Sequence, residues 1–119
     1  MYETIASPIE YGGIRLKNRI IFAPTTMGLK QEDYCEKIRQ IAAGGCAMVI
    51  LGDVPVGRFG FGQSLFTSKG FAAYRELTDI LHRENCLACA QLHQSDSNVK
   101  AMLKYVPGVL TKKISMQDL

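Results

Sequence analysis

The chain has 119 residues, of which 47% are hydrophobic and 21% are charged, and its formal net charge is +3. This composition argues against a disordered chain, and the small excess of positive charge argues against nucleic-acid binding. The length suffices for one small domain with a core, whereas a complete eight-stranded α/β barrel needs about 250 residues.

The sequence carries no signal for export or for membrane insertion. No apolar run approaches the roughly 18 residues that span a bilayer, and the N-terminus lacks the basic start and apolar stretch of a signal peptide. We therefore expect a cytoplasmic protein that does not bind membranes. In that compartment its four cysteines are expected to be reduced thiols: Cys35, Cys46, Cys86 and Cys89.

The first predicted elements are a hairpin and a short strand. In residues 7–17, apolar and polar residues alternate on both sides of Gly12-Gly13, which indicates a β-hairpin. Residues 20–23 are continuously apolar, as is typical of a parallel strand buried on both faces, and Pro24 ends the run.

A helix and a second buried strand are predicted next. Residues 31–43 have a helical pattern with one apolar face, and the glycine pair at 44–45 is a stop signal. Residues 47–51 form another continuous apolar run, which ends at Gly52-Asp53.

A glycine-rich loop over residues 54–70 leads to a second helix and a third strand. Ser68 is the expected N-cap of a helix over residues 69–83, Asn85 is expected to close it, and residues 87–92 form a strand. The helix is expected to bury one face, which carries Phe71, Tyr74, Leu77, Ile80 and Leu81.

Alternation of strands and helices predicts a parallel sheet with right-handed crossovers. Parallel α/β sheets bind ligands at the carboxyl ends of their strands, because loops and helix N-termini converge there. The places to look for chemistry are therefore three strand ends, namely Pro24-Thr25-Thr26, Gly52-Asp53 and residues 91–94.

The residues at these ends have two interpretations each. Pro24 to Met27 offer backbone amides and hydroxyls that suit a flat heteroaromatic ligand, but a plain βα turn capped by Thr26 has the same pattern. The Gln91 amide suits the imide-like edge of a flavin or pyrimidine, but it equally suits neighbouring loop backbone. His93 follows Gln91 by two residues, so both are expected on one face.

The Cys86-Leu87-Ala88-Cys89 stretch matches the spacing of metal-binding and redox cysteine pairs. Here it runs into a predicted strand, where residues three apart point to opposite faces. We therefore expect the two thiols to diverge, and we predict no metal site.

Several stretches of the chain resemble the old yellow enzyme family, the NADH:flavin oxidoreductases. Residues 18–26 read Asn-Arg-Ile-Ile-Phe-Ala-Pro-Thr-Thr and resemble the signature of the family's first strand. Further similar stretches, in family order, are residues 7–9, 12–17, 44–52, 54–58 and 90–93. The resemblance covers residues 7–93 and continues weakly to 119.

This resemblance implies the N-terminal part of a TIM (β/α)8 barrel, namely a β-hairpin plus about three β/α units. Residues 1–119 would be a single partial domain, in which residues 94–119 form an irregular loop and the start of a helix. The family passes hydride from NADH or NADPH to FMN and then to an electron-poor alkene, often an enone or enoate.

The resemblance also implies a role for each matched residue. Pro24 and Thr25 would contact FMN through their backbone, and Thr26 would hydrogen-bond the ring near its O4 and tune its potential. Gly52 would lie at the ring edge, and Gln91 would bind the pyrimidine edge. No catalytic residue is expected in this chain, because the family's substrate-anchoring pair, proton-donating Tyr and phosphate loops come from later strands.

One departure and two alternatives accompany this assignment. Residues 94–97 read Gln-Ser-Asp-Ser where the family usually has His-Ala-Gly-Arg, which puts flavin contacts from that loop in doubt. The first alternative is a non-catalytic small α/β protein that self-associates through open strand edges. The second is one half of a split flavoenzyme, whose partner chain supplies the missing C-terminal part. As an isolated fragment the chain is expected to be inactive.

Overall fold

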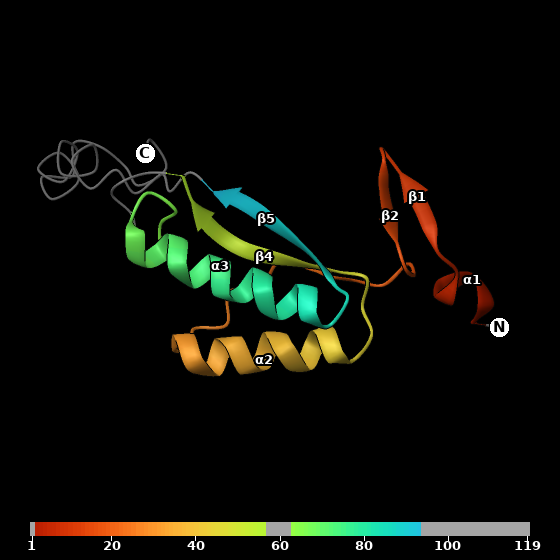
Figure 1. Cartoon of the computed structure of the whole chain (residues 1–119), viewed down its shortest axis with the longest axis horizontal. Coiled ribbons are helices and arrows are strands. Elements are labelled where there is room, and N and C mark those ends of the chain that lie inside the picture. The colour runs from red at the N-terminus through yellow and green to blue at the C-terminus, as the bar shows by residue number, and fades with distance from the viewer. Residues whose placement is uncertain (1, 57–62, 94–119) are drawn as a thin grey trace, which may run out of the picture.

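The computed structural model describes residues 2–56 and 63–93, which form an α/β arrangement of short and long elements (Figure 1). In chain order the elements are α1 (Glu3–Ala6), β1 (Ile9–Tyr11), β2 (Ile14–Leu16), β3 (Ile21–Phe22), α2 (Gln31–Ala43), β4 (Met48–Pro55), α3 (Ser68–Arg83) and β5 (Leu87–His93).

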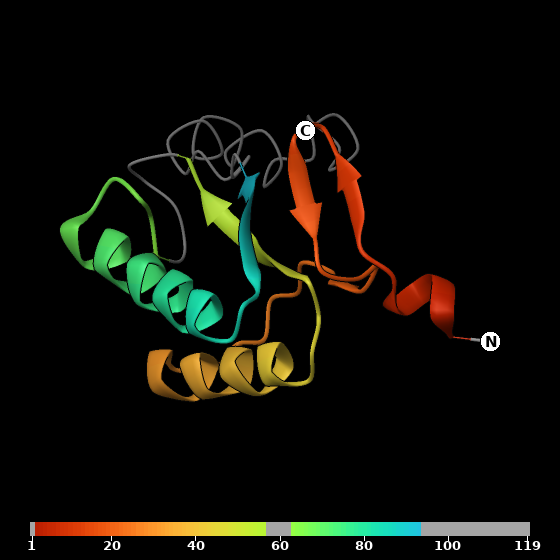
Figure 2. The ribbon, with the colours of Figure 1, turned by 45° about the vertical axis from the view of Figure 1, so that its right-hand side comes forward.

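The predicted hairpin is confirmed. Strands β1 and β2 pair antiparallel, and Gly12 and Gly13 connect them with φ angles of 57° and 78°. Two successive positive φ angles define the tight hairpin turn whose twist matches that of the strands, and glycine adopts them at little cost. The hairpin lies beside α1, away from the two long helices (Figure 2).

The predicted parallel sheet is also confirmed, in the order β3-β4-β5. Its first strand is shorter than expected, because only Ile21–Phe22 is extended and paired. The expectation that this strand is buried on both faces is wrong, since Ile20 is 48% and Ile21 45% exposed. Within residues 2–56 and 63–93, β3 pairs on one side alone, which leaves these two side chains about half exposed.

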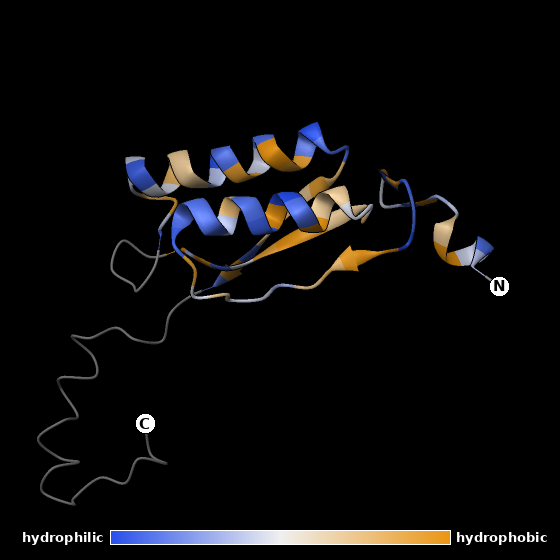
Figure 3. Ribbon diagram, turned by 90° about the horizontal axis from the view of Figure 1, so that it is seen from below, coloured by the Kyte–Doolittle hydropathy of each residue, from blue (hydrophilic) through white to orange (hydrophobic). Residues whose placement is uncertain are grey.

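Helices α2 and α3 lie side by side and cover one face of the sheet (Figures 1 and 2). The strands are mostly hydrophobic, whereas hydrophobic and hydrophilic turns alternate along both helices (Figure 3). This pattern lets each helix direct its hydrophobic side chains toward the sheet. The side chains that are buried most completely are Ile38, Val49, Val54, Leu77, Leu81 and Cys86.

Helix α2 has the predicted bounds, and its start is tied to α3 by one side chain. Gln31 directs its amide nitrogen to the Ala73 carbonyl oxygen at 3.4 Å and to Glu76 at 3.2 Å. The helix ends at the glycine pair, where Gly45 has a φ of 98°. That left-handed conformation favours glycine and stops the helix at the predicted place.

Helix α3 differs from its prediction at two positions. Its N-cap is Thr67 and not Ser68, because the Thr67 hydroxyl accepts a hydrogen bond from the Gly70 amide at 3.0 Å. Phe71 was expected on the buried face but is 58% exposed, whereas Leu77 and Leu81 are fully buried. At the other end Asn85, with a φ of 51°, follows the helix as predicted.

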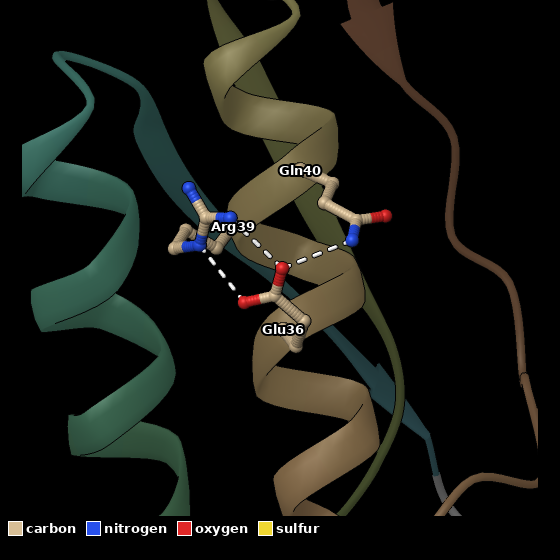
Figure 4. A network of polar contacts seen from close by, with 3 residues as sticks. All are labelled: Glu36, Arg39 and Gln40. Carbon is tan, nitrogen blue, oxygen red and sulfur yellow. Dashed lines mark hydrogen bonds and ion pairs between the residues drawn. The ribbon is translucent and has the colours of Figure 1, made fainter.

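The outer side of α2 carries a small polar network (Figure 4). Arg39 donates two hydrogen bonds to the Glu36 carboxylate, at 2.8 and 2.9 Å, and Gln40 donates a third at 2.9 Å. These bonds lower the pKa of Glu36 to about 2, with the Arg39 contact as the largest cause. Both charged side chains are about half exposed, so solvent screens the pair and it adds little to stability.

No helix in the described part of the chain is long and apolar enough to cross a membrane.

The cysteines do not pair as a CxxC motif, in agreement with the strand argument. Cys86 is buried, and its sulfur lies 3.7 Å from that of Cys46, 40 residues earlier in the chain. Cys89 is only partly buried. No group of three or more His, Cys, Asp or Glu side chains in residues 2–56 and 63–93 is arranged to hold a metal ion.

The buried thiols make stability fall at alkaline pH. Burial, followed by the contact with Cys46, raises the pKa of Cys86 from 9.0 to about 12. The unfolded chain therefore loses the Cys86 proton first, and stability that is complete below about pH 9 declines as the pH rises toward 12. We expect the urea midpoint, measured with reductant, to be lower at about pH 10 than at about pH 7.

A matched pair of variants tests this origin. The pH dependence should be weaker in Cys86→Ala than in Cys89→Ala, because Cys86 is a buried thiol whose pKa is raised, whereas Cys89 is only partly buried. Equal pH dependence in both variants would contradict the assignment.

Candidate functional site

A hollow of about 240 Å³ opens where β3 and β4 reach their carboxyl ends. Residues from both strand ends, from the start of α2 and from α3 meet there. Its lining consists of Thr25, Thr26, Met27, Gly28, Leu29, Gln31, Tyr34, Gly52, Asp53, Gln63 and Tyr74. The segment after β3 thus meets Gly52 and Asp53 at one concave surface. The prediction that these two residues end the second strand is wrong, because β4 continues through them to Pro55.

Gly52 is the residue of β4 that touches the segment following β3. A Cβ atom at this position would lie 2.9 Å from the Thr25 backbone nitrogen and 3.2 Å from the Pro24 Cβ. The first distance is too short for any residue but glycine without movement of the backbone. The absent side chain therefore lets the segment after β3 lie against β4.

Thr25 and Thr26 both line the hollow and are exposed to it. The Thr25 hydroxyl donates to the Ala23 carbonyl oxygen at 3.4 Å. Pro24 does not line the hollow and instead packs behind it, against Gly52. The Thr26 hydroxyl and the adjacent backbone amides make this side a source of hydrogen bonds for a flat polar ring.

Gln91 does not line the hollow directly but is connected to it through Asp53. The Gln91 side-chain oxygen accepts a hydrogen bond from the Asp53 backbone amide at 3.4 Å. His93, two residues further along β5, has its Nδ1 atom 3.0 Å from the Asp53 carboxylate. The prediction that Gln91 and His93 share one face agrees with their common partner.

Two tyrosines of the hollow were not predicted as site residues. Tyr34 and Tyr74 belong to the apolar faces of α2 and α3, and both residues line the hollow. Partial burial is the largest cause that raises the pKa of each, so both carry their proton at neutral pH and can donate hydrogen bonds. A tyrosine in place of an aliphatic residue on a buried face is the only sequence signal for them.

The site as a whole suits a flat ligand with carbonyl and ring-nitrogen acceptors. The Thr26 hydroxyl and the two tyrosines supply donors, and Gly52 lets the Thr25 backbone lie against β4. Gln91 lies beside the hollow, where it accepts a hydrogen bond from the Asp53 amide. Asp53 contacts both Gln91 and His93 of β5, yet it was predicted only as part of a strand end.

The comparisons with known proteins agree with this architecture. No protein-family model matches the sequence. Over 116 residues the chain is 54% identical to a bilirubin reductase of Clostridium symbiosum, which covers 97% of this chain and 31% of that protein. The chain therefore spans less than a third of the length of this relative.

Solved structures share the fold. A 2-naphthoyl-CoA reductase matches with a TM-score of 0.69 and 23% identity, over 80% of this chain and 16% of that one. The old yellow enzyme of Trypanosoma cruzi matches with a TM-score of 0.65 and 21% identity, over 79% of this chain and 28% of that one. The chain therefore shares its fold with part of the old yellow enzymes, in agreement with the resemblance of residues 18–26 to that family.

Proposed function

We propose that this chain supplies the first three strand ends of an FMN-dependent reductase, and that these ends hold the flavin ring. The observation that carries the proposal is the meeting of Thr25, Thr26 and Gly52 at one hollow beside the Asp53–Gln91 contact. The 54% identity to a named bilirubin reductase supports the same class of reaction.

The residues present fit such a ring. Gly52 lets the backbone of Pro24 and Thr25 lie against β4, which brings the Thr25 backbone to the edge of the hollow where a ring could meet it. Thr26 would hydrogen-bond the ring and tune its potential, the backbone of Pro24 and Thr25 would contact its face, and the Gln91 amide would meet its pyrimidine edge. FMN, when bound, supplies hydride chemistry between NADH or NADPH and a substrate.

We further propose that the substrate is a conjugated, electron-poor alkene of the bilirubin type. Bilirubin, the compound in the name of the 54% identical relative, has carbon–carbon double bonds conjugated with lactam carbonyls. Such bonds accept hydride at carbon. Substrate-anchoring groups, the proton donor and the phosphate site would come from further strands of a TIM barrel, whether in the same polypeptide or in a partner chain.

A second candidate is a non-catalytic protein that self-associates. It is favoured by apolar side chains exposed on the two outer strands of the sheet and on the segment before β3, namely Ile20, Ile21 and Leu92. Such surfaces usually mark contacts with another chain. Sedimentation separates the candidates, because this one requires a concentration-dependent oligomer with no affinity for flavin.

The first experiment is a visible difference spectrum of the purified chain titrated with FMN and, separately, with riboflavin. We expect both flavins to bind with affinities equal within about twofold, because the proposed contacts reach only the ring and not the phosphate. Binding of neither flavin would contradict the proposed ring site. Binding of FMN alone would show that residues of this chain hold the phosphate, contrary to the proposal.

A further inference from the structure

Strand β4 contains a bulge beside the proposed flavin site. Its pairing with β5 shifts register between Leu51 and Val54. Two residues of β4, Gly52 and Asp53, therefore lie opposite the single residue Gln91 of β5. Bulges of this kind re-aim backbone and side-chain groups, and they occur preferentially next to functional sites.

Asp53 has a φ of 58°, a left-handed conformation that residues other than glycine rarely adopt. Aspartate and asparagine tolerate it better than most residues. In this conformation the Asp53 amide faces across to β5, where the Gln91 side-chain oxygen accepts from it at 3.4 Å. A left-handed residue in a strand costs free energy, so the contacts around it must hold it in that conformation.

This contact decides which way the Gln91 amide is turned. A backbone N–H can only donate, so it must face the oxygen of the Gln91 side chain and not its nitrogen. At 3.4 Å this hydrogen bond is long, but the opposite orientation would bring the hydrogens of the Gln91 amide nitrogen against the Asp53 N–H. The amide nitrogen, with two hydrogens, is then directed away from Asp53.

The Asp53 side chain holds the same strand at a second point. Its carboxylate lies 3.0 Å from Nδ1 of His93, so a hydrogen on that nitrogen donates to it. One residue of the bulge thus contacts both polar side chains on this face of β5, through its amide and through its carboxylate.

We propose that Asp53 is a positioning residue that turns the Gln91 amide nitrogen toward the acceptors of the flavin pyrimidine edge, with His93 holding its carboxylate in place. The inference rests on the proposed function. A purely structural role, in which Gln91 merely satisfies the bulge, is the competing explanation.

The geometry is tested first without flavin. The chain has two histidines, so its ring ¹⁵N spectrum contains only two spin systems, and His82→Phe assigns them. We expect neutral His93 to carry its hydrogen on Nδ1 in the unmodified chain and to lose that preference in Asp53→Gly and Asp53→Ala. A hydrogen on Nε2 of His93 in the unmodified chain would overturn the inference.

The Gln91 amide provides the second flavin-free readout. Its side-chain resonances should move in Asp53→Ala, where alanine resists the left-handed conformation, and should move less in Asp53→Gly, where the conformation is relaxed. Asp79→Ala, at an exposed position of α3, is the matched control and should leave them in place. Unchanged Gln91 resonances in Asp53→Ala would contradict the positioning role.

Flavin titrations test the consequence. We expect FMN affinity to fall about threefold in Asp53→Gly and about tenfold in Asp53→Ala, the equivalent of about one to two ordinary hydrogen bonds. Gln91→Glu keeps an acceptor for the Asp53 amide but has no hydrogen to donate, so it should also lose about tenfold while the urea midpoint stays constant.

These outcomes separate the two proposals. If Gln91→Glu binds FMN as tightly as the unmodified chain, Gln91 serves the bulge alone and the inference is wrong. If the unmodified chain binds no flavin, the proposed function fails, and the His93 and Gln91 resonances still decide whether Asp53 positions these side chains.

Discussion

Gly52→Ala is expected to lower FMN affinity by more than tenfold, or about 1.4 kcal/mol, and to destabilise the fold by about 1–3 kcal/mol. The new Cβ would lie 2.9 Å from the Thr25 backbone nitrogen, so the segment after β3 must move away from β4. That movement separates the two strand ends that form the hollow. A flavin titration and a urea unfolding curve measure the two effects.

Gly44→Ala is the matched control for loss of a glycine. Gly44 has a φ of −66°, which alanine adopts freely, and it precedes the amino end of β4 and not its carboxyl end. Its added Cβ would meet the Ile41 carbonyl oxygen at 3.1 Å, which a small adjustment relieves. Flavin affinity should be unchanged in this variant. An equal loss of affinity in both variants would show that the contact between Gly52 and Thr25 has no special role.

Leu77→Ala is expected to lower the free energy of unfolding by about 2–5 kcal/mol. Leu77 is completely buried in the core that α3 forms with α2 and the sheet, so truncation leaves a cavity that the neighbours fill only in part. Because small domains have a total stability of about 5–15 kcal/mol, this single change can remove much of it.

Phe71→Ala on the same helix tests whether Phe71 is exposed, as in this structure, or buried, as the helical pattern alone predicts. The sequence pattern places both side chains on the buried face, but Phe71 is 58% exposed. We therefore expect Phe71→Ala to change the urea midpoint much less than Leu77→Ala, with the same unfolding slope in both. A larger effect at Phe71 would mean that another segment covers it in solution.

The sequence by itself determined the elements whose signals are local. The glycine pair at 12–13 required a hairpin turn, and the periodic apolar face of residues 31–43 and the glycines after it determined the bounds of α2. The order of strands and helices then determined a parallel sheet, and with it the edge at which a site could form. These features depend on neighbours within a few residues, which is why they can be read from the chain.

The tertiary structure alone decided how the site is connected. The bulge at Asp53, its contacts with Gln91 and His93, and the entry of Tyr34 and Tyr74 into the hollow join residues that lie far apart in sequence. In α3 the helical period places Phe71 on the face of Leu77 and Leu81, but the folded chain leaves it 58% exposed. Periodicity says which side chains share a face, but only packing between distant segments decides what that face meets.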